Sequence, residues 1–362
     1  MTRPKILLLG EIEHAHDAWK AVTDAADVVK PKATNRDEFL AECKSGAFDG
    51  VSAIYRTGES AAITGNVDVG FLDALPKSIK FICHRGNPLR STSKAKVQIA
   101  DDGKQKAAGY DQIDVDACTA REICVSNVPT AVNDATADTN MFLILGALRN
   151  FPAGMAALRR GEWRGSDLAL GHDPRGKILG ILGMGGIGRN LADKARAFGM
   201  QIRYHNRRKL DPEHEEGAEY VDFETLLKES DVLSLNLPLN PSTRHTISKD
   251  QFAIMKPGIV IVNTARGAVM DEAALVEALD SGRVASAGLD VFEDEPNVHE
   301  GLLKNDRVLL VPHLGTYTIE TTIKMEAFAI NNVKKAALEG ALITIVPEQR
   351  DLEAKLLKGR DV

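Results

Sequence analysis

The sequence predicts an α/β protein with two doubly wound domains, each built on a parallel sheet. Short apolar runs rich in β-branched residues alternate with longer stretches of helical spacing almost throughout the chain. Each run is continuously apolar, which is typical of strands that helices cover on both faces. The runs fall into two groups, and 362 residues exceed the roughly 250 at which a single core usually stops growing.

The apolar runs predict the strands. The first third of the chain contains runs at residues 5–9, 51–55, 80–84 and 123–125. The middle contains runs at residues 178–182, 202–204, 232–237, 259–263, 285–289 and 308–311. Between the two groups, apolar residues at helical spacing predict a helix over 134–149, with Asn133 as its N-cap. A second long helix is predicted over 318–339, where it can carry the chain back to the first domain.

This returning helix predicts a split domain. Residues 1–127 plus 318–362 would form a substrate domain around a second domain at 128–317. The segment 87–107 breaks the rhythm of the first domain, because it is polar, contains several lysines and has neither helical nor strand period. A compact α/β domain seldom carries a structureless loop of this length. We therefore expect an insertion here that does not belong to the ancestral fold.

Composition and charge exclude several classes of protein. The net charge of −6 gives no electrostatic footprint for nucleic acid or for an anionic membrane. The apolar residues 6–9 are too few for a signal-peptide core or a membrane span, so we expect a cytoplasmic protein. The cysteines show neither CxxC spacing nor a partnering histidine pattern, so we expect them reduced and mostly buried, without metal or disulfide. They are Cys43, Cys83, Cys118 and Cys124.

A glycine-rich motif follows the first predicted strand of the second domain. Residues 183–188 read GMGGIG, with a predicted strand before them and a helical stretch over 189–198 after them. Gly183 would permit the tight turn, Gly185 would let the backbone approach a pyrophosphate, and Gly188 would allow close helix–strand packing. The helix N-terminus offers unpaired N–H groups to phosphates. Against the alternative of a purely structural turn, the motif predicts a Rossmann dinucleotide-binding domain, inserted in a flavodoxin-like substrate domain.

The end of the next strand predicts the cofactor. Asn206 lies eighteen residues after Gly188, where an NAD enzyme usually places an acidic residue on the ribose 2′-hydroxyl. A carboxylate would repel a 2′-phosphate, whereas Asn206 does not, and Arg207 and Arg208 offer positive charge to one. A solvated basic turn is the alternative interpretation. The charge pattern favours NADP over NAD.

Three chemically reactive residues, Arg266, Glu295 and His313, each follow a predicted strand of the second domain. Taken singly they have ordinary explanations, such as a solvated arginine or a core histidine. Open α/β sheets bind ligands at the carboxyl ends of their strands, so we expect the three to gather there. Arginine can hold a carboxylate, histidine can exchange a hydroxyl proton near neutral pH, and glutamate can orient and stabilise the imidazolium. Together they suit a 2-oxo acid.

Several motifs together resemble the D-isomer-specific 2-hydroxyacid dehydrogenase family. Besides the glycine motif they are residues 108–114 (AGYDQID), 132–138 (VNDATAD), 263–267 (NTARG), 287–292 (AGLDVF), Glu295-Pro296 and Pro312-His313. The resemblance covers nearly the whole chain and extends to D-mandelate dehydrogenase-like members and glyoxylate/hydroxypyruvate reductases. It implies NAD(P)-dependent interconversion of a small 2-oxo acid and its D-2-hydroxy acid by hydride transfer. It also implies that the arginine, glutamate and histidine above are catalytic, in a homodimer joined mainly through the dinucleotide domain.

The resemblance further implies which residues contact the ligands. Cofactor contacts would come from Gly183, Gly185, Gly186, Ile187, Gly188, Asn206, Arg207, Arg208, Leu237, Pro238, Thr264, Ala265 and Asp290. Substrate contacts would come from Tyr55, Arg56, Ala108 and Gly109. No metal is implied.

Two departures from the family pattern bear on activity. After His313 the chain has Leu-Gly-Thr-Tyr where many members have a Gly-Ser or Gly-Gly turn, which would reshape the pocket. The insertion separates Gly86 from Ala108, and joining these two residues restores a family-like turn that helps to hold the substrate carboxylate. We therefore expect the insertion to impair turnover. The alternative function is an NAD(P)-sensing scaffold, similar to the family's transcriptional corepressors, which retain the same three residues.

Overall fold

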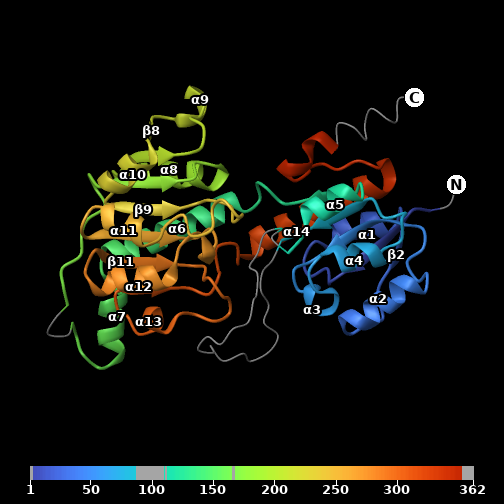
Figure 1. Cartoon of the computed structure of the whole chain (residues 1–362), viewed down its shortest axis with the longest axis horizontal. Coiled ribbons are helices and arrows are strands. Elements are labelled where there is room, and N and C mark those ends of the chain that lie inside the picture. Colours follow the sequence, from blue (N-terminus) through green and yellow to red (C-terminus); the bar gives the residue numbers. More distant parts are fainter. Residues whose placement is uncertain (1–2, 87–109, 111, 165–167, 353–362) are drawn as a thin grey trace. The chain divides into compact units, whose positions relative to one another are not determined.

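The computed structural model describes residues 3–86, 110, 112–164 and 168–352. Residues 3–86, 110, 112–131 and 318–352 form one compact unit, and residues 132–164 and 168–317 form the other. Each unit is a parallel sheet with helices on both faces (Figure 1), which confirms the predicted fold class. The insertion predicted at 87–107 lies outside the described residues, so its effect on turnover stays a prediction.

The first unit contains a five-stranded sheet in the order β2-β1-β3-β4-β5, in which all neighbours are parallel. Its strands are β1 (Lys5–Leu9), β2 (Asp27–Val29), β3 (Val51–Arg56), β4 (Phe81–His84) and β5 (Cys124–Ser126). Its helices are α1 (His16–Thr23), α2 (Arg36–Lys44), α3 (Ala61–Thr64), α4 (Val69–Ala74), α5 (Val115–Ala120), α14 (Ile319–Glu339) and the 3-10 helix η2 (Pro347–Gln349). One face of the sheet packs against α2 and α4, and the other against α1 and α14. The sequence did not predict β2, because three residues beginning with an aspartate make too short an apolar run.

The second unit contains a seven-stranded sheet in the order β12-β11-β10-β9-β6-β7-β8, again with parallel neighbours. Its strands are β6 (Ile178–Leu182), β7 (Gln201–His205), β8 (Glu219–Tyr220), β9 (Val232–Leu235), β10 (Ile259–Asn263), β11 (Val284–Leu289) and β12 (Val308–Leu310). Its helices are α6 (Asn133–Leu148), α7 (Phe151–Arg159), α8 (Gly186–Ala197), α9 (Pro212–Glu215), α10 (Phe223–Glu229), α11 (Lys249–Ile254), the 3-10 helix η1 (Gly267–Val269), α12 (Glu272–Asp280) and α13 (Glu300–Leu303). The strand order reverses between β6 and β9, and such a switch point is where doubly wound sheets bind ligands. The two-residue edge strand β8 was not predicted.

Two predicted helix starts were wrong. Asn133 is the first residue of α6 rather than its N-cap, and Val132 occupies the cap position without a capping side-chain bond. The side chain of Asn133 lies instead against α8, because a Cβ placed on Gly186 would come within 2.4 Å of its amide nitrogen. Helix α8 itself begins at Gly186, inside the glycine motif, rather than at residue 189. The returning helix α14 agrees closely with its prediction and is capped by Thr318, whose hydroxyl accepts the N–H of Thr321 at 3.2 Å.

The four cysteines are buried, and no disulfide joins them. Burial raises the pKa of the Cys43 thiol to about 11 and that of the Cys83 and Cys118 thiols to about 12. Among the described residues, no group of three or more histidine, cysteine or acidic side chains could hold a metal ion. Within the same residues no single helix is long and apolar enough to cross a membrane; α6 and α7 pass that test only as a pair, and they are bent by 73°.

Candidate active site

Neighbouring strands bring the three candidate catalytic residues to one edge of the second sheet. Strands β10, β11 and β12 are parallel and adjacent, so their carboxyl ends lie at the same edge. Arg266 follows β10, Glu295 follows β11 and His313 follows β12. Two of the three, His313 and Glu295, are hydrogen-bonded to each other, and the turn that carries Arg266 packs against the backbone just before Glu295.

His313 and Glu295 form a hydrogen-bonded pair. Nδ1 of His313 lies 2.9 Å from Oε2 of Glu295, and the other carboxylate oxygen accepts the N–H of Phe292 at 3.0 Å. The side chains of Glu295 and His313 are 5% and 16% exposed. An ionised carboxylate can only accept, so Nδ1 is the donor, and Nε2 remains as the ring nitrogen for exchange with a ligand. The pair therefore has the geometry of an oriented acid–base imidazole.

The turn that carries His313 is fixed by Asp290. The backbone N–H of His313, whose φ is 53°, donates to the Asp290 carbonyl at 2.8 Å. The Asp290 carboxylate accepts the N–H groups of Leu314 and Gly315. Burial raises the pKa of this carboxyl to about 6, while His313 opposes that shift. A Cβ on Gly315 would come within 2.9 Å of the carboxylate, so a side chain at this position would push against Asp290.

The turn that carries Arg266 is held by hydrogen bonds of Asn263 and by a close backbone contact at Gly267. Asn263, fully buried, accepts the N–H of Ala265 at 3.0 Å and donates to the carbonyl of Arg266 at 2.9 Å. A Cβ on Gly267 would lie 1.9 Å from the carbonyl carbon of Phe292. Glycine at this position thus lets the Arg266 turn press against the backbone that precedes Glu295 in the chain. Arg266 itself is half-buried.

The glycine motif has the shape that a dinucleotide needs. Gly183 has φ of 100°, and a Cβ there would meet the carbonyl oxygen of Asn236 at 2.7 Å, whereas one on Gly188 would meet that of Gly183 at 2.6 Å. Gly185 is exposed, with no atom within 4 Å of the place where its Cβ would be. Helix α8 begins at the next residue without a capping side chain, so its first N–H groups are available to an anion. Gly186 and Ile187 form this first turn and are half-buried.

The turn after β7 differs in one respect from its predicted role. Oδ1 of Asn206 accepts the N–H of Met184 at 2.7 Å, which ties the end of β7 to the glycine motif. This bond uses the oxygen that could otherwise have faced a ribose. Arg207 and Arg208 are exposed and have no ion-pair partner in the described part of the chain. The two guanidinium groups therefore supply the positive charge of this turn.

Thr264, another predicted cofactor contact, rests on a buried polar network that the sequence did not reveal. Its hydroxyl accepts the side-chain N–H of Asn140 at 2.9 Å, and Asn140 accepts the hydroxyl of Ser234 at 3.1 Å. Asn140 and Ser234 are both fully buried. The available signal was a polar residue inside each of two apolar stretches, α6 and β9. Leu237 and Pro238 follow β9, one half-buried and the other exposed.

Two of the predicted substrate contacts, Tyr55 and Arg56, are buried in the first unit. Tyr55 is fully buried, its ring packs 5.7 Å from that of Trp19, and burial raises the pKa of its hydroxyl. Its side chain therefore presents no exposed surface to a substrate. Arg56 is also fully buried, and it donates to Gln112 and to the carbonyl of Gly65, each at 3.3 Å. Ala108 and Gly109 lie outside the described residues.

One buried acid near the catalytic pair was missed altogether. Glu272, at the start of α12, is 6% exposed and accepts the N–H of Glu293 at 2.6 Å. Burial raises the pKa of its carboxyl to about 7. The sequence offered little signal, because an acid in the first turn of a helix is usually a solvated residue that favours the helix dipole.

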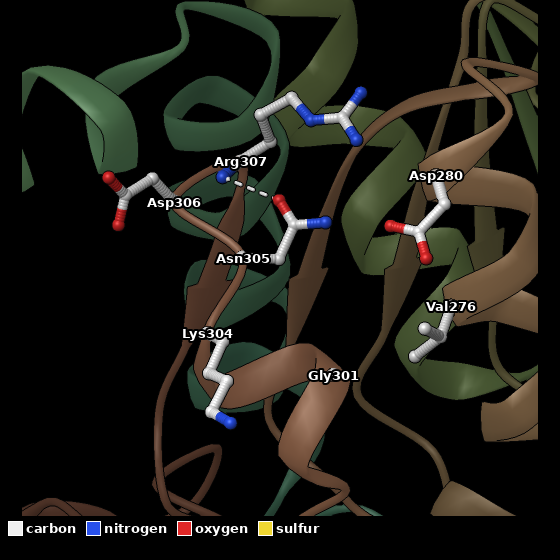
Figure 2. Close-up of a pocket in the computed structure, with 7 residues that line it drawn as sticks. All are labelled: Val276, Asp280, Gly301, Lys304, Asn305, Asp306 and Arg307. Atoms are coloured by element: carbon white, nitrogen blue, oxygen red, sulfur yellow. Dashed lines mark hydrogen bonds between the residues drawn. The ribbon is translucent and has the colours of Figure 1, made fainter.

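A cavity of about 430 Å³ lies at the opposite end of the second sheet. It is formed by α12, α13 and the residues that lead into β12 (Figure 2). Two of its charged side chains have partners elsewhere: Arg307 donates to the carbonyl of Leu279 at 2.6 Å, and Asp306 pairs with Arg160 at 2.8 Å. We assign no ligand to it.

Comparisons with known proteins agree with this geometry. The family model described as "D-isomer specific 2-hydroxyacid dehydrogenase, NAD binding domain" matches residues 141–315. 4-Methyl-2-oxopentanoate reductase A of Aspergillus oryzae is 51% identical over 349 residues, which cover 96% of this chain and 99% of the relative. The sequence's expectation of an NAD-binding domain is thereby confirmed.

Solved structures are similar over nearly the whole chain. A glyoxylate reductase from Paecilomyes thermophila has a TM-score of 0.87 at 52% identity, covering 97% of this chain and all of the other. The D-mandelate dehydrogenase of Rhodotorula graminis has a TM-score of 0.86 at 32% identity, covering 96% and 98%. An NADPH-dependent glyoxylate/hydroxypyruvate reductase from Sinorhizobium meliloti, solved with NADP and malonate, has a TM-score of 0.76 at 30% identity, covering 96% and 98%.

These proteins are reductases or dehydrogenases by name, and none of them supports the alternative of a scaffold without turnover. The strand-end arginine, glutamate and histidine, the glycine motif and the near full-length similarity all agree with the resemblance seen in the sequence. The chain belongs to the D-isomer-specific 2-hydroxyacid dehydrogenase family.

Proposed function

We propose that this protein reduces a small 2-oxo acid to its D-2-hydroxy acid with NADPH, and catalyses the reverse oxidation. The observation that carries the proposal is the His313–Glu295 pair, in which a buried carboxylate holds one ring nitrogen and leaves the other for the ligand. A bound nicotinamide supplies or accepts the hydride. The open space over Gly185 and the uncapped start of α8 fit its pyrophosphate.

The roles of the protein's own residues follow from their chemistry. Arg266 holds the substrate carboxylate through its planar pair of N–H donors. In reduction, Nε2 of His313 gives its proton to the oxygen on C2 as hydride arrives at the carbon. Glu295 stabilises the imidazolium before that transfer and keeps the ring oriented. A positioned proton donor of this kind contributes roughly 10²–10⁴-fold in rate.

The preference for NADPH over NADH rests on charge. The turn after β7 contains Asn206, Arg207 and Arg208, so no carboxylate opposes a 2′-phosphate, and two exposed guanidinium groups can bind one. The similar enzyme of Sinorhizobium meliloti is described as NADPH-dependent. Steady-state kinetics with each cofactor test this preference directly, and a lower kcat/KM with NADPH than with NADH would contradict it.

We also propose a homodimer. On α7, Phe151, Met155 and Leu158 are 48%, 45% and 59% exposed, and their spacing of four and three residues places them on one face. Phe142 on α6 is 54% exposed. Contiguous exposed apolar groups of this kind mark association surfaces. Sedimentation equilibrium should show a dimer, and a double variant of Met155→Lys and Leu158→Asp should be monomeric.

The substrate is best sought among compounds that the relatives' names suggest. NADPH oxidation should be measured with glyoxylate, hydroxypyruvate, 4-methyl-2-oxopentanoate and benzoylformate. Reduction of at least one of them, abolished in the His313→Ala variant, is the expected result. Absence of turnover with the whole panel, while NADPH still binds, would contradict the proposed activity.

A further inference from the structure

The buried carboxylate of Glu272 has no part in the proposed reaction, yet it lies beside the residues that do. Glu272 is the first residue of α12 and is only 6% exposed. It is not needed as a cap, because Asp271 already accepts the N–H of Ala274 at 3.0 Å. An acid in the first turn of a helix is stabilised equally well when it faces solvent. Its burial therefore calls for another reason.

Glu272 is hydrogen-bonded to the segment that contains Glu295. Its carboxylate accepts the N–H of Glu293 at 2.6 Å. Glu293 lies two residues before Glu295, in the connection between β11 and α13. One side chain thus fixes the start of this segment against α12.

The surroundings of Glu272 disfavour the charged form of its carboxyl group. The carboxylates of Glu293 and Glu295 both oppose ionisation of Glu272, and burial opposes it further. Glu293 is itself paired with Nε2 of His245 at 2.6 Å and with Arg244 at 2.7 Å, while Glu295 is paired with His313. Burying a polar group is offset only when it is hydrogen-bonded. The N–H of Glu293 is the hydrogen-bond donor that the Glu272 carboxylate gains in this place.

We infer that Glu272 is a positioning residue for the proposed reaction, holding the backbone at Glu293 so that the Glu295 carboxylate, two residues later, meets Nδ1 of His313. The inference rests on the proposed function and on contacts inside the second unit only. Glu272 acts through Glu295 and touches neither substrate nor cofactor in this role.

Two substitutions separate the hydrogen bond from the charge. Glu272→Gln keeps an oxygen that can accept the N–H of Glu293 but removes the negative charge, whereas Glu272→Leu removes both. The matched control is Glu277→Gln on the same helix, since Glu277 is exposed and pairs with Lys249 at 2.8 Å. For each variant we would measure kcat and KM for 2-oxo acid reduction, NADPH affinity by fluorescence, and the pH dependence of kcat/KM.

Glu272→Leu should lower kcat about tenfold or more with NADPH affinity nearly unchanged, because a displacement of about 1 Å at a catalytic group can cost on the order of 10²-fold. Glu272→Gln should stay within about threefold of wild type near neutral pH, since its hydrogen bond persists. The reductase activity of Glu272→Leu should also be lost at lower pH than in wild type, because a displaced Glu295 carboxylate stabilises the protonated His313 less well. Glu277→Gln should match wild type in every measurement.

A Glu272→Leu variant that binds NADPH and keeps wild-type kcat would overturn the inference. If Glu272→Leu does not fold, Glu272→Ala decides: a wild-type kcat and pH profile refute the inference, and a lower kcat with a profile shifted to lower pH supports it. Absence of turnover in wild type would be a failure of the proposed function instead. In that case the NMR titration of the His313 ring, assigned with a His313→Gln variant, decides, because its midpoint should still fall in the variant that lacks the hydrogen bond to Glu293.

Discussion

Replacing Glu295 with glutamine tests the catalytic pair with the least change in shape. In the wild-type protein one carboxylate accepts two hydrogen bonds, from Nδ1 of His313 at 2.9 Å and from the N–H of Phe292 at 3.0 Å. A glutamine amide has only one oxygen. It can serve Phe292 and turn its NH₂ toward Nδ1, or serve Nδ1 and turn its NH₂ toward the Phe292 donor. Either orientation loses one bond, and the first directly disfavours the imidazolium.

The magnitude follows from the burial of Glu295. A hydrogen bond to a charged group is worth about 1.5–3 kcal/mol, and an orphaned buried donor costs about 1–3 kcal/mol. The carboxylate is 5% exposed, so little solvent screening applies. At about 1.4 kcal/mol for each factor of ten, kcat/KM for reduction should fall roughly 10- to 100-fold. The high-pH loss of reductase activity should also move to lower pH, because the neutral amide no longer favours the charged imidazole.

The assay is NADPH oxidation with a saturating 2-oxo acid between pH 5 and 9, accompanied by NADPH titration to show that the cofactor still binds. Glu277→Gln serves as the control for loss of an acidic residue on the same unit. A Glu295→Gln variant whose pH profile matches that of wild type would show that this carboxylate does not support the charged imidazole. The reasoning from the 2.9 Å contact would then be refuted.

Three further predictions follow from the same unit. His313→Ala should bind NADPH normally but lose about two to four decades in kcat, whereas Arg266→Ala should mainly raise KM for the oxo acid; near-normal turnover in both would contradict the assignment. Asn206→Asp keeps an acceptor for Met184 but adds charge, so kcat/KM should come to favour NADH, and an unchanged preference would count against the role of this turn. Because burial raises the pKa of Glu272 to about 7, its contribution to stability is present at low pH and is lost as the pH rises toward 7. The free energy of unfolding of wild type relative to Glu272→Gln should therefore fall by about 2 kcal/mol from pH 5 to pH 8 in denaturant titrations, and a pH-independent difference would contradict the shift.

The sequence predicted the strands well wherever they are buried on both faces. Runs such as 178–182 and 259–263 are continuously apolar, and the structure has strands with those bounds. It did not predict β2 and β8, since edge strands of three and two residues have too few apolar positions to form a pattern. The start of α8 was placed too late, because glycine has a poor helix propensity and the first turn is glycine-rich.

The candidate catalytic residues could be found in the sequence because their position depends on topology. Once three runs are assigned to adjacent parallel strands, the residues that follow them must share one edge of the sheet. The His313 and Glu295 side chains could be expected to pair because they lie at that same edge and can carry opposite charges. The prediction of the substrate residues rested on a weaker argument, namely the resemblance to the family alone. In the structure Tyr55 belongs to β3, and alternation along the strand directs its side chain into the core.

The residues that hold the site in place could not be found in this way. Asn140, Ser234 and Glu272 are polar residues whose burial depends on partners 90 or more positions away, or on a backbone N–H group that any residue could supply. A buried polar side chain persists only where such partners satisfy it, so its role is defined by the folded structure. The catalytic residues at the strand ends follow from the order of the strands along the chain, so they can be predicted from the sequence. The residues that hold these catalytic residues in place depend on contacts in the folded structure. Glu272 could therefore be identified only from its 2.6 Å contact with the Glu293 backbone.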